Sequence, residues 1–144
     1  VGRELLTHLP LTLKTNNMNR EFIPYEQALE LKELGFDFPC LGYYHNTLGS
    51  DNAGLFIKET TTEIYEMINL PEDVYTLAPL FQQAFRWFRE KYGLVAWVEG
   101  KRVYRYCIES PIPTDGQLSL SPFRTCQEAE LACLKKLIEV VKIK

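Results

Sequence analysis

Two helical segments with the same punctuation constrain the fold of this chain most. Pro24 and Pro79 each stand where a helix can begin, because the N–H that proline lacks has no partner in the first turn. Gly35 and Gly93 mark the ends, since glycine readily adopts the left-handed conformation found just past a helix. Two short helices are therefore predicted, and they leave no long crossover of the kind that a parallel sheet needs.

The first predicted hairpin lies between these two helices. Residues 40–44 (CLGYY) and 55–59 (LFIKE) are separated by a polar run rich in Asn, Gly, Ser and Asp, which is typical of two strands joined by a long loop. Residues 60–78 fit either a strand or a short helix. Three consecutive threonines lower helix propensity there and favour a strand or irregular structure.

A second hairpin is predicted where residues 94–99 and 102–109 flank Gly100 and Lys101. A two-residue loop with glycine first is typical of a type II′ turn, and the turn fixes which residues of the two strands lie opposite each other. The predicted register follows from this turn alone.

That register divides the second hairpin into two faces. Trp97 lies opposite Tyr104, and Tyr106 joins them on an aromatic face. The other face carries Arg105 among smaller apolar residues, namely Leu94, Ala96, Val98, Val103 and Cys107. Arg105 favours the aromatic face as the buried one, because arginine is rarely buried without a partner. The alternative leaves the aromatic row exposed.

A third helix is predicted at the C-terminus, where Thr125 is the N-cap and Glu128 its capping-box partner. The pattern as a whole predicts a single α+β domain over residues 18–144. We expect a small antiparallel sheet of four or five strands and three helices, in the order helix, hairpin, helix, hairpin, helix. Residues 1–17 are expected to form an N-terminal extension outside the core, with Met18 as the natural start.

Three motifs of the chain also resemble a known group of proteins. The stretches EFIPYEQALELKELGF (21–36), QAFRWFREKYGL (83–94) and EAELACLKKLIE (128–139) are similar to those of a family of small uncharacterised proteins from gut bacteria and their phages. The resemblance covers residues 18 to the end, and it is strongest at the two later motifs. It implies a compact protein of phage or mobile-element origin, and it carries no catalytic residues to this chain.

Charge is distributed unevenly along the sequence. The net charge is −3, but residues 20–79 hold 11 acidic and 3 basic residues, a net −8, whereas residues 80–105 hold 6 basic and 2 acidic residues, a net +4. The overall acidic balance argues against nucleic acid as a partner. The asymmetry favours association with a charged protein surface or with a second copy.

Composition also bears on location and redox state. No apolar run is long enough for a membrane span, and the first residues lack the pattern of a signal peptide, so we expect a cytoplasmic protein that does not enter a membrane. The four cysteines are expected to be reduced thiols, because a domain of this size has no need of disulfides.

Residues suited to catalysis or metal binding are few. Cys40 and His45 alone leave a metal ion short of ligands, so no metal site is predicted. Cys126 at the start of the last helix is the best nucleophile candidate, because unpaired N–H groups there favour a thiolate, but the sequence places no base beside it. We therefore predict no catalytic residue and no cofactor, and an enzyme is the less favoured class.

Two functions remain as predictions. The first is a small non-enzymatic binding protein that acts by occupying a protein partner or by self-association, with Arg86 and Arg89 of the second helix as an interaction surface. The second is a protein that sequesters a small nucleotide or another planar anion. Its site is the second hairpin, with aromatic residues for stacking and cations for charge: Trp97, Tyr104, Tyr106, Arg102 and Lys101.

Overall fold

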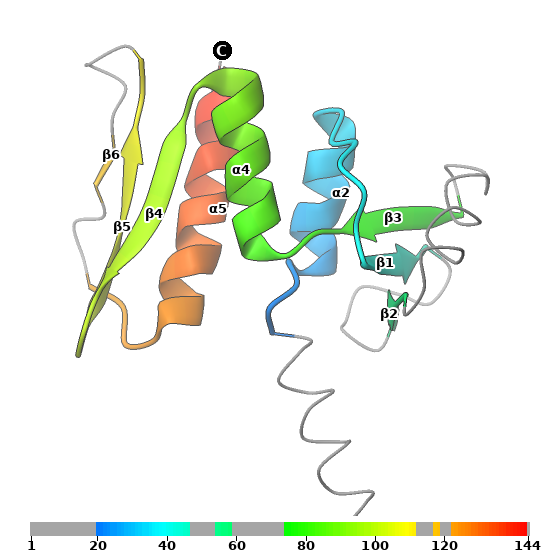
Figure 1. Ribbon diagram of the computed structural model, residues 1–144, viewed down its shortest axis with the longest axis horizontal. Helices are drawn as coiled ribbons and strands as arrows, with labels where there is room; N and C mark the ends of the chain where they lie inside the picture. The colour runs from blue at the N-terminus through cyan, green and yellow to red at the C-terminus, as the bar shows by residue number, and fades with distance from the viewer. Residues whose placement is uncertain (1–19, 47–53, 59–73, 112–116, 119–121, 144) are drawn as a thin grey trace, which may run out of the picture.

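Helices lie between two antiparallel sheets in the computed structural model (Figure 1). The structure describes residues 20–46, 54–58, 74–111, 117–118 and 122–143. The helix layer within these ranges consists of α2 (Tyr25–Glu33), α4 (Phe81–Tyr92) and α5 (Cys126–Ile143). The predicted extension over residues 1–17 and the start at Met18 lie outside the described residues.

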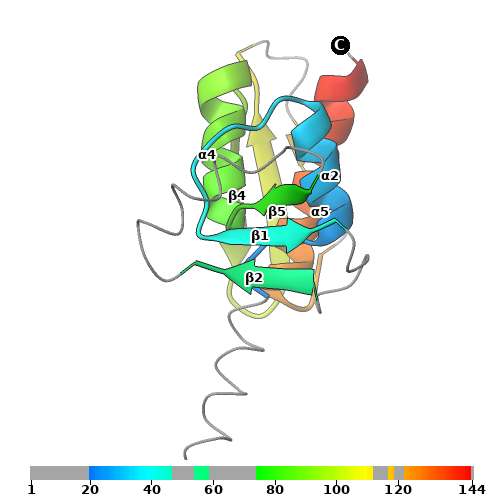
Figure 2. The same cartoon turned by 90° about the vertical axis from the view of Figure 1, so that its right-hand side faces the viewer.

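The first sheet has the strand order β2-β1-β3, from β1 (Gly42–His45), β2 (Leu55–Ile57) and β3 (Tyr75–Ala78). β1 and β2 confirm the predicted first hairpin. β3 lies in the 60–78 segment for which strand or irregular structure was favoured, and most of that segment is outside the described residues. Figure 2 shows these strands running across the direction of the helices.

The second sheet has the order β4-β5-β6, from β4 (Val95–Gly100), β5 (Tyr104–Glu109) and β6 (Gln117–Leu118). The α+β class with antiparallel pairing is confirmed. The strands are nevertheless divided between two three-stranded sheets, in place of the predicted single sheet of four or five. β3 agrees with the strand alternative for residues 60–78, whereas β6 was not predicted, because a strand of two residues is too short for a sequence pattern to reveal.

Both glycine helix ends are confirmed. Gly35 has a φ of 91°, and the Phe36 N–H after it donates to the Leu31 carbonyl at 2.9 Å, as expected when a helix ends in a left-handed glycine. Gly93 has a φ of 71° at the end of α4. Pro79 lies two residues before α4 rather than in its first turn, and its carbonyl accepts the Ile23 N–H at 3.0 Å.

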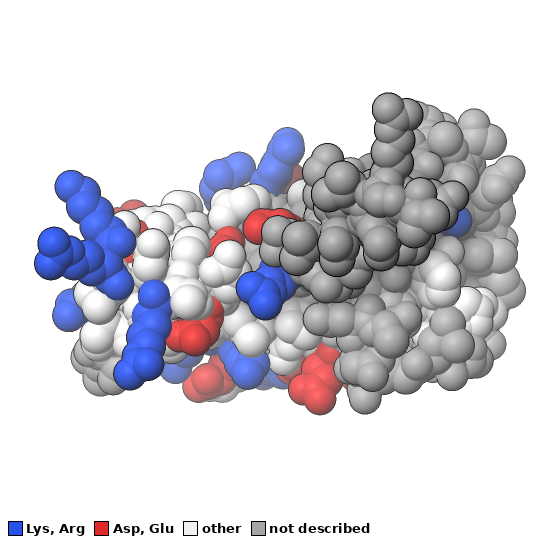
Figure 3. Space-filling view, turned by 90° about the horizontal axis from the view of Figure 1, so that it is seen from below, with Lys and Arg blue, Asp and Glu red and all other residues white. Residues whose placement is uncertain are grey.

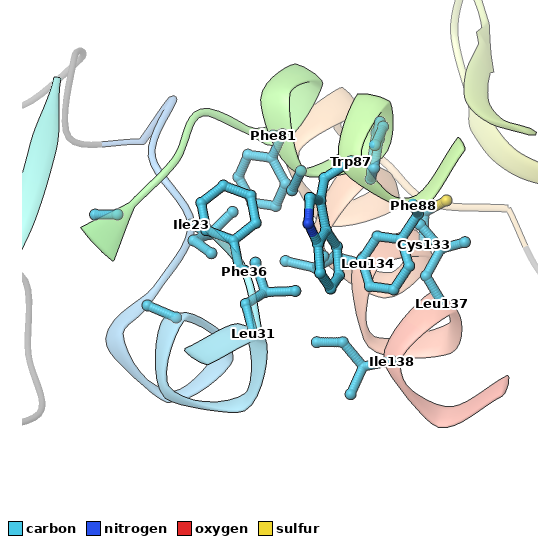
Figure 4. Close-up of a cluster of buried hydrophobic side chains, with 14 of the residues drawn as sticks. Ile23, Leu31, Phe36, Phe81, Trp87, Phe88, Cys133, Leu134, Leu137 and Ile138 are labelled. Carbon is cyan, nitrogen blue, oxygen red and sulfur yellow. The ribbon is translucent and has the colours of Figure 1, made fainter. Parts of the chain in front are cut away.

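One contiguous core joins the helices to both sheets (Figure 4). Trp87 corrects the sequence interpretation, which placed it at the border of the α4 apolar face, because only 2% of it is exposed. Its ring lies 5.4 Å from Phe36 and 5.1 Å from Phe88, centroid to centroid. The turn after α2 covers this second side of α4, so α4 is buried over a wider arc than its own periodicity predicts.

The predicted N-cap of the last helix is confirmed. Thr125 Oγ1 accepts the Glu128 N–H at 3.1 Å, which satisfies one of the N–H groups that an α-helix leaves without a helical partner. None of the described helices is both long enough and apolar enough to cross a membrane.

Candidate functional site: the second hairpin

The loop of the β4–β5 hairpin is longer than predicted. Gly100 pairs with Tyr104, so Lys101, Arg102 and Val103 form a three-residue loop, and the predicted two-residue turn is wrong. Gly100 has a φ of 147°, and a side chain there would collide with the Val103 carbonyl oxygen. Glycine is therefore needed at this position, but as the last residue of the strand.

The loop is one residue longer than predicted and starts one residue later, so Glu99 lies opposite Arg105 in place of Arg102, a register shift of three residues. An odd shift exchanges the faces of one strand. Trp97 pairs with Cys107, whereas Tyr106 pairs with Val98. Tyr106 packs against the core on the side of α5, and burial raises its pKa. Tyr104 shares that inner face with Tyr106. The three predicted stacking residues therefore do not form one row, since Trp97 lies on the opposite face.

The outer face of this sheet combines one large ring with polar and charged residues. The half-buried Trp97 donates its indole N–H to a Glu99 carboxylate oxygen at 3.3 Å. Cys107 beside it is 9% exposed, and burial raises the pKa of its thiol, with a further contribution from Glu99. Arg105 is exposed on this face, as its charge predicted.

Basic side chains gather at the end of the hairpin. Lys101 and Arg102 are exposed in the loop, as predicted, and Val103 after them is 51% exposed. Arg124 lies close by, because the backbone of the residue before it, Phe123, pairs with Tyr104 through two hydrogen bonds of 2.8 Å.

We call Lys101, Arg102, Arg105 and Arg124 the basic tip. All four are exposed, and within the described ranges none of them forms an ion pair. Figure 3 shows lysine and arginine side chains projecting at the end of the molecule where the second sheet lies.

The other predicted interaction residues lie on the outer side of α4. Arg86 and Arg89 are exposed, as predicted. Arg86 is already engaged by Glu90 at 2.9 Å, one helical turn later, so part of its charge is neutralised. This surface therefore offers less unpaired positive charge than the basic tip.

A cavity of about 250 Å³ lies between α2 and β3, and the sequence did not reveal it. Lys32 and Asp37 are the charged residues in its lining. The Lys32 ammonium group donates to the Tyr75 carbonyl at 3.0 Å, so it links α2 to the edge of the first sheet. That contact gives Lys32 a structural role here.

Cys126 does not have the environment of a nucleophile. Burial raises the pKa of its thiol, and the nearby Glu130 raises it further, with Sγ 3.7 Å from a Glu130 carboxylate oxygen. Burial also raises the pKa of Glu130. Burial and the Glu130 carboxylate thus both favour the protonated Cys126 thiol over the thiolate.

The remaining cysteines are similarly protonated. Burial raises the pKa values of Cys40 and Cys133 to about 12, and all four cysteines are free thiols. The Cys40 thiol bonds to the Phe38 carbonyl at 3.2 Å. In the part of the chain that the structure describes, no three His, Cys, Asp or Glu side chains are grouped so as to hold a metal ion.

No protein-family model matches the chain, and searches of curated proteins and of solved structures find no match to it.

Proposed function

We propose that this chain is a small non-enzymatic binding protein that acts by occupying a protein partner, and that the β4–β5 hairpin makes the contact. One observation carries the proposal: the basic tip presents four exposed cations that have no ion pair among the described residues. Unpaired surface charges of one sign steer and orient association with a surface of opposite charge.

The chemistry of the cysteines supports the non-enzymatic part of the proposal. Catalytic thiols have a lowered pKa, whereas burial raises the pKa of each cysteine in this chain. The phage or mobile-element origin rests on the sequence resemblance alone and stays a prediction. The nucleotide alternative loses its geometric support, because Trp97 and the two tyrosines lie on opposite faces.

Pull-down from a lysate with matched bait variants tests this function. Lys101→Glu with Arg102→Glu reverses two charges of the basic tip, and Arg89→Glu with Lys135→Glu makes the same charge change on exposed helix positions. We expect the first pair to lose a captured protein that the wild type and the second pair retain. Capture of nothing, or equal capture by all three baits, contradicts the proposal.

A further inference from the structure

β4 forms one edge of the second sheet. β4 is the first strand in the order β4-β5-β6, and its six residues all pair with β5. Within the described residues, no backbone hydrogen bond joins β4 to anything on its other side. Such an edge presents N–H and C=O groups on which another strand can pair.

Side-chain exposure along β4 agrees with an accessible edge. Ala96 and Val98 point toward the helix layer and yet remain partly exposed, whereas Ile108 on the central strand is 2% exposed. On the outer face, Val95 is 39% exposed and lies two residues from Trp97. The edge therefore has an apolar half, and beyond Gly100 it leads into the loop of the basic tip.

We propose that β4 accepts an extended peptide segment of a partner protein, acidic at one end and apolar at the other. This inference rests on the proposed function and names the chemistry of the partner. The peptide backbone pairs antiparallel with β4, as the other strands of this sheet do. Its N-terminal acidic residues then meet Lys101 and Arg102, and apolar residues at alternate positions lie beside Trp97 and Val95.

Charge complementarity favours acidic residues in the partner. The two cations that continue β4 are Lys101 and Arg102, and the planar guanidinium group of Arg102 can bind a carboxylate through two parallel hydrogen bonds. Glu99 disfavours a further acidic residue directly opposite it in the added strand. The cations of the loop therefore favour acidic residues near the N-terminus of the peptide, and Glu99 favours an uncharged residue at the position opposite it.

A second copy of the chain fits this edge less well. The antiparallel registers that match faces and pair most of each β4 strand put Glu99 opposite Val95 or opposite Trp97. Neither register brings Glu99 to a cation, and both leave the basic tip without a carboxylate.

Nucleic acid fits less well too. Its phosphates would meet Glu99 and Glu109 on the same sheet face as the basic tip. The aromatic side chains do not form a continuous surface for base stacking, since Trp97 is hydrogen-bonded to Glu99 and the tyrosines face the helices.

A fluorescent peptide of sequence EESTTVTV tests the inference by polarisation, because its glutamates reach the loop when its two valines lie beside Trp97 and Val95. We expect saturable binding that weakens at least about tenfold with Lys101→Glu and Arg102→Glu, and that weakens in high salt. The Arg89→Glu and Lys135→Glu variant is the control for net charge, and its affinity should equal that of the wild type.

Backbone methylation of the peptide distinguishes strand pairing from charge attraction alone. In an antiparallel pair, alternate N–H groups of the added strand point toward its neighbour. Methylation of one alternate set of peptide nitrogens should abolish binding, and methylation of the other set should preserve it. The variants of the protein are not needed for this step, so no folding defect can produce the result.

Several outcomes overturn the inference. Equal tolerance of both methylated sets excludes strand addition, and a single-stranded oligonucleotide that competes with the peptide at similar affinity identifies nucleic acid as the ligand. A dimer in light scattering that the peptide dissociates identifies a second copy as the natural occupant. Absence of peptide binding, together with hairpin-dependent capture from a lysate, rejects this partner chemistry and leaves the proposed function standing.

Discussion

The two sheets of this protein differ in the hydrogen bonds that their edge strands make. At the β3 edge of the first sheet, the Lys32 side chain bonds to the Tyr75 carbonyl, and the Ile23 N–H bonds to the Pro79 carbonyl just beyond the strand. In the second sheet, β4 is longer and makes no such contact on its outer side within the described residues. Beyond its last residue, the chain continues into Lys101 and Arg102 of the basic tip.

The difference separates a structural sheet from a candidate binding sheet. Tyr44 at the centre of the first sheet is fully buried, and its hydroxyl donates to the Ile23 carbonyl at 2.7 Å. Polar groups of the first sheet are thus used to hold it to the α2 end of the core. Within the described residues, the backbone groups at the outer edge of β4 have no such partner, and an edge of this kind must resist aggregation.

Phe88→Ala has the largest expected effect, and it tests whether one hydrophobic core supports both sheets. Phe88 is fully buried in a cluster that also contains Tyr44 of β1 and Ile108 of β5. Phe88→Ala should lower the free energy of unfolding by about 3–5 kcal/mol. Circular dichroism during denaturant unfolding should still show a single transition.

Phe56→Ala provides the matched control, because Phe56 is 40% exposed on β2. We expect Phe56→Ala to lower the free energy of unfolding by less than about 1 kcal/mol. Two separate unfolding transitions in the Phe88→Ala variant would show that the two sheets unfold as independent units. They would then not share one hydrophobic core.

Alkaline pH should lower the free energy of unfolding by less than Phe88→Ala does, and the loss should increase as the pH rises. Burial raises the pKa values of Cys40, Tyr44 and Cys133 to about 12, from ordinary values of 9.0 and 10.0. These acids keep their protons longer in the folded state, so their contribution is complete below the unfolded pKa values and is lost as pH approaches 12. Urea midpoints measured from pH 8 upward should therefore fall, and a flat profile would show that folding does not raise these pKa values.

Tyr44→Phe compares the sheets at the level of one hydroxyl group. Its removal leaves the Ile23 carbonyl without that partner in a buried place, and should cost about 1–3 kcal/mol. Tyr104→Phe is the matched change in the second sheet, where the structure gives the hydroxyl no hydrogen bond among the described residues, and it should cost less than about 0.5 kcal/mol. Equal losses measured by urea unfolding would contradict the structural assignment of the first sheet.

Local signals predicted the helices and the presence of the two hairpins. Gly35 and Gly93 mark helix ends through a backbone property of glycine itself, and Thr125 caps α5 through its own hydroxyl. Burial of Trp87 could not be predicted in this way. It depends on Phe36, which is distant in sequence and reaches α4 only after the α2 turn has formed.

The sequence predicted the candidate site in the β4–β5 hairpin but assigned Trp97 and the two tyrosines to the same face of it. Both the predicted and the observed register place Glu99 opposite an arginine, Arg102 in one and Arg105 in the other, so charge pairing could not choose between them. The choice depends on where the loop begins as well as on whether it has two or three residues. Arg124 was missed for a different reason, since it joins the tip through the backbone pairing of Phe123 with Tyr104.

The smallest effect is expected on the outer side of α4. Arg86→Ala and Arg89→Ala should each change the free energy of unfolding by about 0.5 kcal/mol or less, because both side chains are exposed and an exposed ion pair such as Arg86–Glu90 contributes little. Neither change should alter binding of the EESTTVTV peptide, since these residues lie outside the basic tip. Denaturant unfolding and peptide titration of the double variant measure both properties. A loss as large as that of Phe88→Ala would show that the arginines are buried and paired. A loss of peptide affinity without a loss of stability would move the binding surface from the open hairpin to the helix beside it.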